Sequence, residues 1–94
     1  MMTTIEASAP SKQEIAAWII AWLAEETGIA ASEIEVEQSL LNYSMSSISA
    51  TILVGDIEDW LGLTLEPTLA WDYPSIAAIV DHLADLLARA PTDA

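Results

Sequence analysis

The sequence predicts an all-α protein, a three-to-four-helix bundle with a long first loop. Three segments carry apolar residues at intervals of three and four, the spacing that places side chains on one face of a helix. No segment shows the alternation of apolar and polar residues that is typical of a half-buried strand. The length of 94 residues indicates one small domain, which we expect at residues 10–90, with flexible ends at residues 1–9 and 91–94.

The first helix is expected between Ser11 and Gly28. Ser11 and Glu14 form the capping-box pattern of a helix start, and glycine suits the left-handed position that ends a helix. One apolar stripe lies between these signals, and we expect it, tryptophans included, to pack in the core. The stripe consists of Ile15, Trp18, Ile19, Trp22 and Leu23.

Residues 29–45 are expected to form a long connection, with a short helical turn at residues 32–34. Its apolar residues follow no clean period, so we expect a loop that they pin to the core. These residues are Ile34, Val36, Leu40 and Leu41. Loops of this length in compact domains are often functional.

A second helix is expected from Ser46 or Ser47 to Leu61, closed by Gly62. Glycine in mid-helix costs about 1 kcal/mol relative to alanine, so Gly55 indicates a close approach by another group. The residues expected to face the core are Ala50, Leu53, Val54, Ile57 and Leu61.

The remaining chain is expected to hold a short helical turn at residues 68–71 and a last helix at residues 76–88. Ser75 is placed to cap the last helix, and His82 is expected at its surface. The core-facing residues of this helix are Ile76, Ile79, Val80, Leu83, Leu86 and Leu87.

The composition excludes several classes of partner. Fifteen Asp and Glu residues against Lys12 and Arg89 give a formal net charge of −13, which repels nucleic acid and anionic membrane surfaces and attracts basic protein surfaces. The absence of cysteine and the single histidine argue against a disulfide framework or a zinc site. The first residues do not resemble a signal peptide, and the longest apolar stretch is too short to span a bilayer, so a cytoplasmic protein is expected.

No catalytic pattern is present in the sequence. It lacks a spacing typical of a Ser/His/Asp triad, a glycine-rich phosphate loop and a cluster of metal ligands. Its adjacent acidic residues are typical of solvated helix faces. The adjacent serines Ser46 and Ser47 remain, just before an apolar helical run. Each of them, taken alone, is typical of a helix cap.

The segment LLNYSMSSISATILVGDIEDWLGLTLEPTLAWDYPSIAAIVDHLADLL resembles an acyl carrier protein of the modular (type I) polyketide synthase kind. The family's motif is a glycine, an apolar residue, Asp-Ser and Leu or Ile at the start of the second helix, followed by a helix-ending glycine and a DYP signature. The resemblance covers residues 11–88. The matching positions are Tyr43, Met45, Ser47, Ile48, Ala50, Leu53, Ile57, Leu61, Gly62, Asp72, Tyr73, Pro74, Ser75 and Ile76.

This register assigns Ser47 to the modified serine of the family. The resemblance implies that a phosphopantetheinyl transferase, using magnesium and coenzyme A, attaches 4′-phosphopantetheine to Ser47. The terminal thiol of this arm holds acyl or polyketide groups as thioesters and presents them to enzymes such as an acyltransferase and a ketosynthase. The expected protein is therefore a monomeric carrier domain of polyketide or fatty acid biosynthesis and not an enzyme.

Two positions depart from the family's motif. Ser44 stands where the family has glycine, and Ser46 stands where it has aspartate. Serine retains the ability to cap the helix, but the negative charge of the aspartate is lost.

The outer face of the second helix is expected to contact partner enzymes near the base of the arm. We expect Asp56 and Glu58 to flank a stripe of residues three or four positions apart. The stripe consists of Ile48, Thr51, Ile52, Gly55 and Asp59. The alternative is that the acids only keep a small apolar domain soluble.

Two other functions remain open at this point. A peptidyl carrier domain of a nonribosomal peptide synthetase shares the fold and the modified serine. An unmodified helical adaptor would keep the fold and the acidic face without the arm, and the replacement of aspartate by Ser46 favours this alternative.

Overall fold

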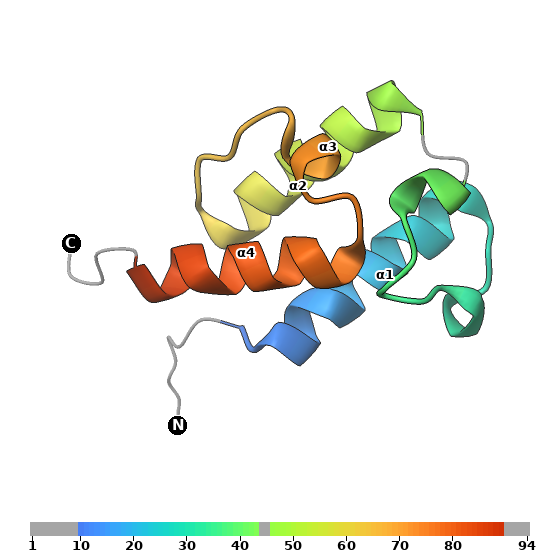
Figure 1. Ribbon diagram of the computed structural model, residues 1–94, viewed down its shortest axis with the longest axis horizontal. Helices are drawn as coiled ribbons and strands as arrows, with labels where there is room; N and C mark the ends of the chain where they lie inside the picture. Colours follow the sequence, from blue (N-terminus) through green and yellow to red (C-terminus); the bar gives the residue numbers. More distant parts are fainter. Residues whose placement is uncertain (1–9, 44–45, 90–94) are drawn as a thin grey trace.

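The computed structural model describes residues 10–43 and 46–89, and within these it confirms the predicted helical bundle (Figure 1). A short helix, α3, lies between the second and last long helices in the chain, and two 3₁₀ turns interrupt the long first connection. The elements are α1 (Lys12–Thr27), η2 (Ala31–Glu33), η3 (Leu40–Tyr43), α2 (Ser47–Leu61), α3 (Leu69–Asp72) and α4 (Ile76–Arg89).

The helix ends follow the chemistry predicted from the sequence. The Glu14 amide donates to Ser11 Oγ at 3.1 Å and the Ser11 amide donates to Glu14 Oε1 at 2.7 Å, which is the reciprocal capping box. Gly28 and Gly62 end α1 and α2 with φ values of 78° and 70°. Only glycine adopts this left-handed region without strain, so these two residues fix where the helices stop.

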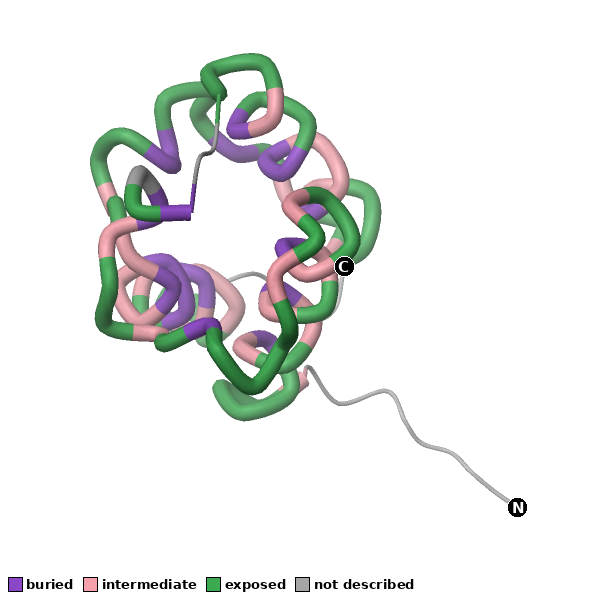
Figure 2. The backbone as a smooth tube through the Cα atoms, turned by 90° about the vertical axis from the view of Figure 1, so that its right-hand side faces the viewer, coloured by how far each residue is buried: buried purple, intermediate pink, exposed green. Residues whose placement is uncertain are grey.

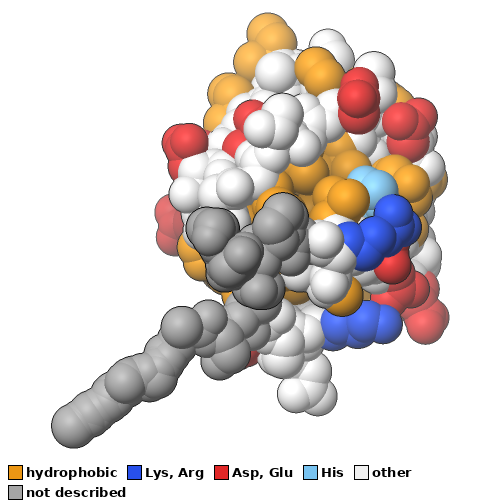
Figure 3. Space-filling view, turned by 90° about the vertical axis from the view of Figure 1, so that its left-hand side faces the viewer, with side chains coloured by type: hydrophobic (Ala, Val, Ile, Leu, Met, Phe, Trp, Pro, Cys, Tyr) orange, Lys and Arg blue, Asp and Glu red, His pale blue; other side chains and the backbone are white. Residues whose placement is uncertain are grey.

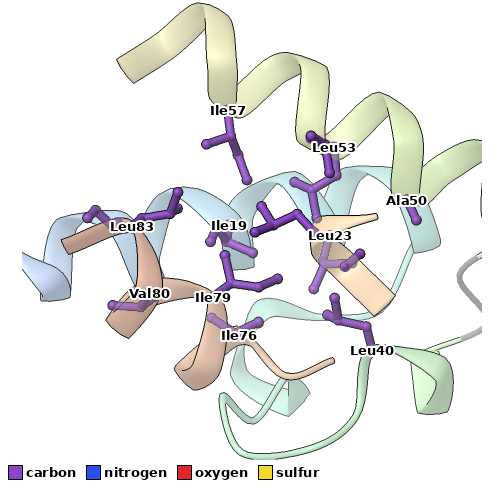
Figure 4. Packing of buried hydrophobic residues seen from close by; sticks show 14 of the residues in the cluster. Ile19, Leu23, Leu40, Ala50, Leu53, Ile57, Ile76, Ile79, Val80 and Leu83 are labelled. Carbon is purple, nitrogen blue, oxygen red and sulfur yellow. The ribbon is translucent and has the colours of Figure 1, made fainter. Parts of the chain in front are cut away.

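The core lies where α1, α2 and α4 face one another (Figure 4). The backbone segments coloured as buried lie mainly on the inside of the bundle, and the exposed segments lie on its outside (Figure 2). Leu61, Leu86 and Leu87 were predicted in the core, but they are only half-buried at its edge. The side chains with almost no exposed surface are Ile15, Ile19, Leu23, Leu53, Ile57, Leu69, Ile76, Ile79 and Leu83.

The prediction that Trp18 and Trp22 pack in the core is confirmed only in part. Both are half-buried and pack against the outside of the core. Trp18 stacks on Trp60 with ring centroids 4.7 Å apart, and the Trp22 indole donates to Asp56 Oδ2 at 2.7 Å. An indole N–H needs a hydrogen-bond acceptor when it is buried. Trp22 finds this acceptor in half-buried Asp56, outside the core.

The connection between α1 and α2 is tied to the start of α4. The Leu40 amide donates to the Pro74 carbonyl at 2.7 Å, and the Ala77 amide donates to the Val36 carbonyl at 2.8 Å. Ile34 and Leu40 are buried as predicted and Val36 is half-buried, whereas the side chain of Leu41 lies outside the described residues. The predicted turn at residues 32–34 is η2, one residue earlier, and η3 was not predicted.

The helices in the last part of the chain agree with the prediction to within one residue, but the position of His82 does not. Ser75 Oγ accepts a hydrogen bond from the Ala78 amide at 3.1 Å and caps α4, while the predicted short turn is α3. His82, expected at the surface, is half-buried and stacks on Tyr73 at a centroid distance of 4.2 Å. Among the described helices, none combines the length and the apolar character that a membrane span requires.

Candidate functional site

The two adjacent serines have different structural roles at the start of α2. Ser46 is the N-cap, with φ −86° and ψ 167°, and its hydroxyl oxygen accepts a hydrogen bond from the Ser49 amide at 3.0 Å. Ser47 is the first helical residue and is exposed. Its hydroxyl makes no hydrogen bond to another described residue, so it is available for reaction whereas the Ser46 hydroxyl is used in the cap.

The start of α2 also fits the phosphodiester of a phosphopantetheine arm. The backbone N–H groups of Ser47 and Ile48 make no hydrogen bond to a described residue, as is usual in the first turn of a helix. Free N–H groups and the positive end of the helix dipole favour an anion at this place, by about 0.3–1 kcal/mol at an exposed site. A phosphate ester on the Ser47 hydroxyl would lie beside these groups.

The predicted contact stripe on α2 is exposed along most of its length. Ile48 and Ile52 are 72% and 48% exposed, which is unusual for isoleucine and places an apolar strip next to Ser47. Thr51 is exposed, and its hydroxyl donates to the Ser47 carbonyl at 3.0 Å. Gly55 is half-buried, but the predicted close approach is not found among the described residues: a Cβ built there meets nothing within 4 Å.

The acids along α2 divide into bonded and free carboxylates. Asp56 accepts the hydrogen bond from Trp22, and Glu58 Oε2 accepts one from the Leu65 amide at 2.6 Å. Both residues are half-buried. Asp59 is exposed and forms no hydrogen bond or ion pair with another described residue. Of the three, Asp59 is therefore the carboxylate most available to a partner.

The charges of the molecule are unevenly distributed. Lys12 at the start of α1 pairs with Asp81 at 3.2 Å, and Arg89 at the end of α4 pairs with Asp85. Figure 3 looks at the left-hand side of Figure 1 and shows the basic side chains together on this face. The first turn of α2 lies toward the opposite side in Figure 1. Because both bases are paired and lie away from the first turn of α2, they do not offset negative charge at that end of the helix.

Sequence reasoning missed three features of the described residues. Trp71 on α3 is 49% exposed. This exposure was missed because a single aromatic residue in a short turn gives no periodic signal for its orientation. Ser49 donates a hydrogen bond to Glu26 at 2.6 Å, a contact between residues 23 positions apart that no local pattern could predict. An open hollow of ≈ 340 Å³ lies between the connection at residues 64–67 and α4, at the end of α2 that is distant from Ser47.

Comparison with known proteins identifies the family. Residues 17–83 match the family described as "Phosphopantetheine attachment site". One subunit of the phenolphthiocerol/phthiocerol polyketide synthase from Mycobacterium tuberculosis is 33% identical over 67 residues, which are 71% of this chain. The chain spans only 4% of the length of that relative.

Two solved structures share the fold at higher identity. A free-standing peptidyl carrier protein from Acinetobacter baumannii has a TM-score of 0.77 and 38% identity, covering 82% of this chain and 96% of its own. An acyl carrier protein from Anabaena sp. PCC 7120 with a variant phosphopantetheinylation-site sequence has a TM-score of 0.76 and 36% identity, covering 93% and 97%.

The family match covers more than half of the chain, and the helical arrangement agrees with that of carrier proteins. The family carries 4′-phosphopantetheine as a covalently attached cofactor. The protein belongs to the phosphopantetheine attachment site family and is a carrier domain.

Proposed function

We propose that this domain is an acyl carrier whose 4′-phosphopantetheine arm is attached to Ser47. The observation that carries the assignment is the difference between the two serines: the Ser46 hydroxyl caps α2, while the exposed Ser47 hydroxyl has no partner among the described residues. The similarity to part of a polyketide synthase supports acyl or polyketide cargo.

Attachment of the arm is a phosphoryl transfer on a partner enzyme. The Ser47 oxygen attacks the β-phosphorus of coenzyme A on a phosphopantetheinyl transferase, with magnesium balancing the phosphate charge. A serine–phosphorus bond forms, the pyrophosphate bond breaks, 3′,5′-adenosine bisphosphate leaves and the serine proton passes to a base or to water. When attached, the arm supplies a thiol that holds acyl groups as thioesters.

The stripe on α2 is proposed as the surface that partner enzymes contact. Exposed Ile48 and Ile52 lie close to Ser47 along the helix. Farther along, Asp59 adds a carboxylate that forms no ion pair with another described residue. A transferase, acyltransferase or ketosynthase that approaches Ser47 would meet an apolar strip bordered by negative charge. Basic residues around an apolar notch on the partner would be complementary to this surface.

A peptidyl carrier is the second candidate function. It is favoured by the 38% identity to a free-standing peptidyl carrier protein, which covers most of this chain. The two candidates differ in what loads the arm. A malonyl- or acyl-specific acyltransferase should load an acyl carrier, whereas an adenylation enzyme that activates an amino acid should load a peptidyl carrier.

The arm itself is tested by intact mass spectrometry. The protein is incubated with coenzyme A, magnesium and a broad-specificity phosphopantetheinyl transferase, next to an established carrier domain as control. A mass gain of one phosphopantetheine group is expected. If the control gains the arm and this protein does not, the carrier function is rejected in favour of an unmodified adaptor.

A further inference from the structure

A chain of hydroxyl groups links a carboxylate on α1 to the start of α2. The Ser49 hydroxyl donates to Glu26 Oε2 at 2.6 Å, and the Ser46 hydroxyl donates to Ser49 Oγ at 3.2 Å. The Ser49 amide donates back to Ser46 Oγ at 3.0 Å. Each hydroxyl therefore donates once and accepts once, and the series ends on a negative charge, which polarises it.

The position of Glu26 is unfavourable for its own helix and favourable for the next one. Glu26 lies one residue before the end of α1, where the helix dipole disfavours a negative charge, and the last turn of α1 contains no basic residue. The start of α2 favours a negative charge, and its first turn contains no acid. Glu26 thus supplies from α1 a carboxylate that the first turn of α2 lacks.

The linked serines flank the residue that carries the arm. Ser46 immediately precedes Ser47, and Ser49 follows it by two positions. The link from Glu26 to Ser49 crosses the long connection, so it ties the first turn of α2 directly to α1. The orientation of Ser47 relative to the body of the domain then depends in part on this contact.

A carboxylate near Ser47 also matters to a transferase. An enzyme that binds coenzyme A must surround its phosphates with basic side chains and magnesium, and Ser47 has to enter this positive environment. A negative charge bonded to the start of α2 is attracted there, whereas Ser46 itself is uncharged. Both bases of the chain are paired elsewhere and do not neutralise Glu26.

We propose that Glu26 is a positioning and specificity residue for phosphopantetheine transfer to Ser47. Through Ser49 it holds the Ser46 cap, and it provides the negative charge that residue 46 does not provide. This inference rests on the proposed attachment at Ser47 and adds to it the element of the fold that the transferase recognises.

The test measures the steady-state kinetics of arm attachment, with intact mass spectrometry as the readout. The two variants compared are Glu26→Gln and its matched neighbour Glu25→Gln. Each variant loses one charge, but Glu25 has no hydrogen bond or ion pair with another described residue. Glutamine can still accept from Ser49, so Glu26→Gln removes charge with little change in shape. We expect it to raise the KM for the carrier about five- to tenfold with a smaller change in kcat, and Glu25→Gln to change KM less than about twofold.

Two further variants separate the charge from a general effect on folding. Ser46→Asp places a carboxylate directly before Ser47. In the Glu26→Gln background it should therefore lower KM back to its original value, whereas in the protein without other substitutions it should lower KM much less. Ser49→Ala removes the hydroxyl that holds Glu26. The increase in KM that it causes should not add to the increase caused by Glu26→Gln when the two substitutions are combined. Far-ultraviolet circular dichroism and thermal unfolding verify that every variant is folded.

The outcomes separate this inference from the proposed function. If the unaltered protein gains the arm and Glu26→Gln has the same KM as Glu25→Gln, the role of Glu26 is rejected while the carrier function stands. The same rejection follows if Ser46→Asp improves both backgrounds by an equal factor. If the unaltered protein gains no arm while a control carrier does, the proposed function fails and this inference fails with it.

Discussion

The indole Nε1 of Trp22 on α1 donates a hydrogen bond of 2.7 Å to Oδ2 of Asp56 on α2. Beside it, Trp18 and Trp60 stack nearly parallel, with an interplanar angle of 8°. These contacts join the flank of α2 to α1 outside the core. Asp56 therefore has a structural role in addition to the partner contact proposed for it, whereas Asp59 is free of such contacts among the described residues.

Replacement of Asp56 is expected to destabilise the domain more than replacement of Asp59. Asp56→Ala leaves the half-buried indole N–H without its acceptor and should lower the free energy of unfolding by about 1–2 kcal/mol. Asp59→Ala should change it by no more than about 0.5 kcal/mol. Urea unfolding followed by tryptophan fluorescence measures both, and equal losses would show that the hydrogen bond contributes nothing.

Alanine at Gly55 is expected to stabilise the domain. Gly55 is in the middle of α2 and a Cβ built there meets nothing within 4 Å, so Gly55→Ala should raise the unfolding free energy by about 0.5–1 kcal/mol. Gly62→Ala is the opposite control, because its φ of 70° strains any residue with a Cβ. A stability loss in Gly55→Ala, measured by thermal or urea unfolding, would mean that the space beside it is filled.

Charge reversal on the outer face of α2 is expected to slow loading by an acyltransferase. Asp59→Lys should lower kcat/KM at least about threefold at low salt, and the difference should shrink as ionic strength rises. Glu37→Lys makes the same charge change at an exposed position of the long connection. If both variants lose efficiency equally, the effect is one of net charge and the proposed surface on α2 is wrong.

The sequence predicted the features that depend on neighbouring residues. Ser11, Glu14 and Gly28 mark the ends of α1 by chemistry within a few positions, and the three-four spacing found the buried faces. The position of Ser47 came from the register of the family motif and agrees with its place as the first residue of α2.

Contacts between elements could not be predicted in this way. Trp22 and Asp56 are 34 positions apart, and Glu26 and Ser49 are 23 apart, so their proximity depends on how α1 and α2 pack. The three-four spacing predicted Trp22 in the core because the pattern treats tryptophan as a purely apolar residue. It takes no account of the hydrogen bond that the indole N–H must make. The turn η3 was missed because its residues follow no helical period.

Peptide mapping after arm attachment tests the central claim most directly. The protein is modified by a phosphopantetheinyl transferase, digested, and the site located by tandem mass spectrometry, with Ser47→Ala and Ser46→Ala as matched variants. The arm is predicted on Ser47, with no attachment in Ser47→Ala and retained attachment in Ser46→Ala, although loss of the cap should cost the latter about 1 kcal/mol of stability. An arm found on Ser46, or full loading of Ser47→Ala, would contradict the assignment.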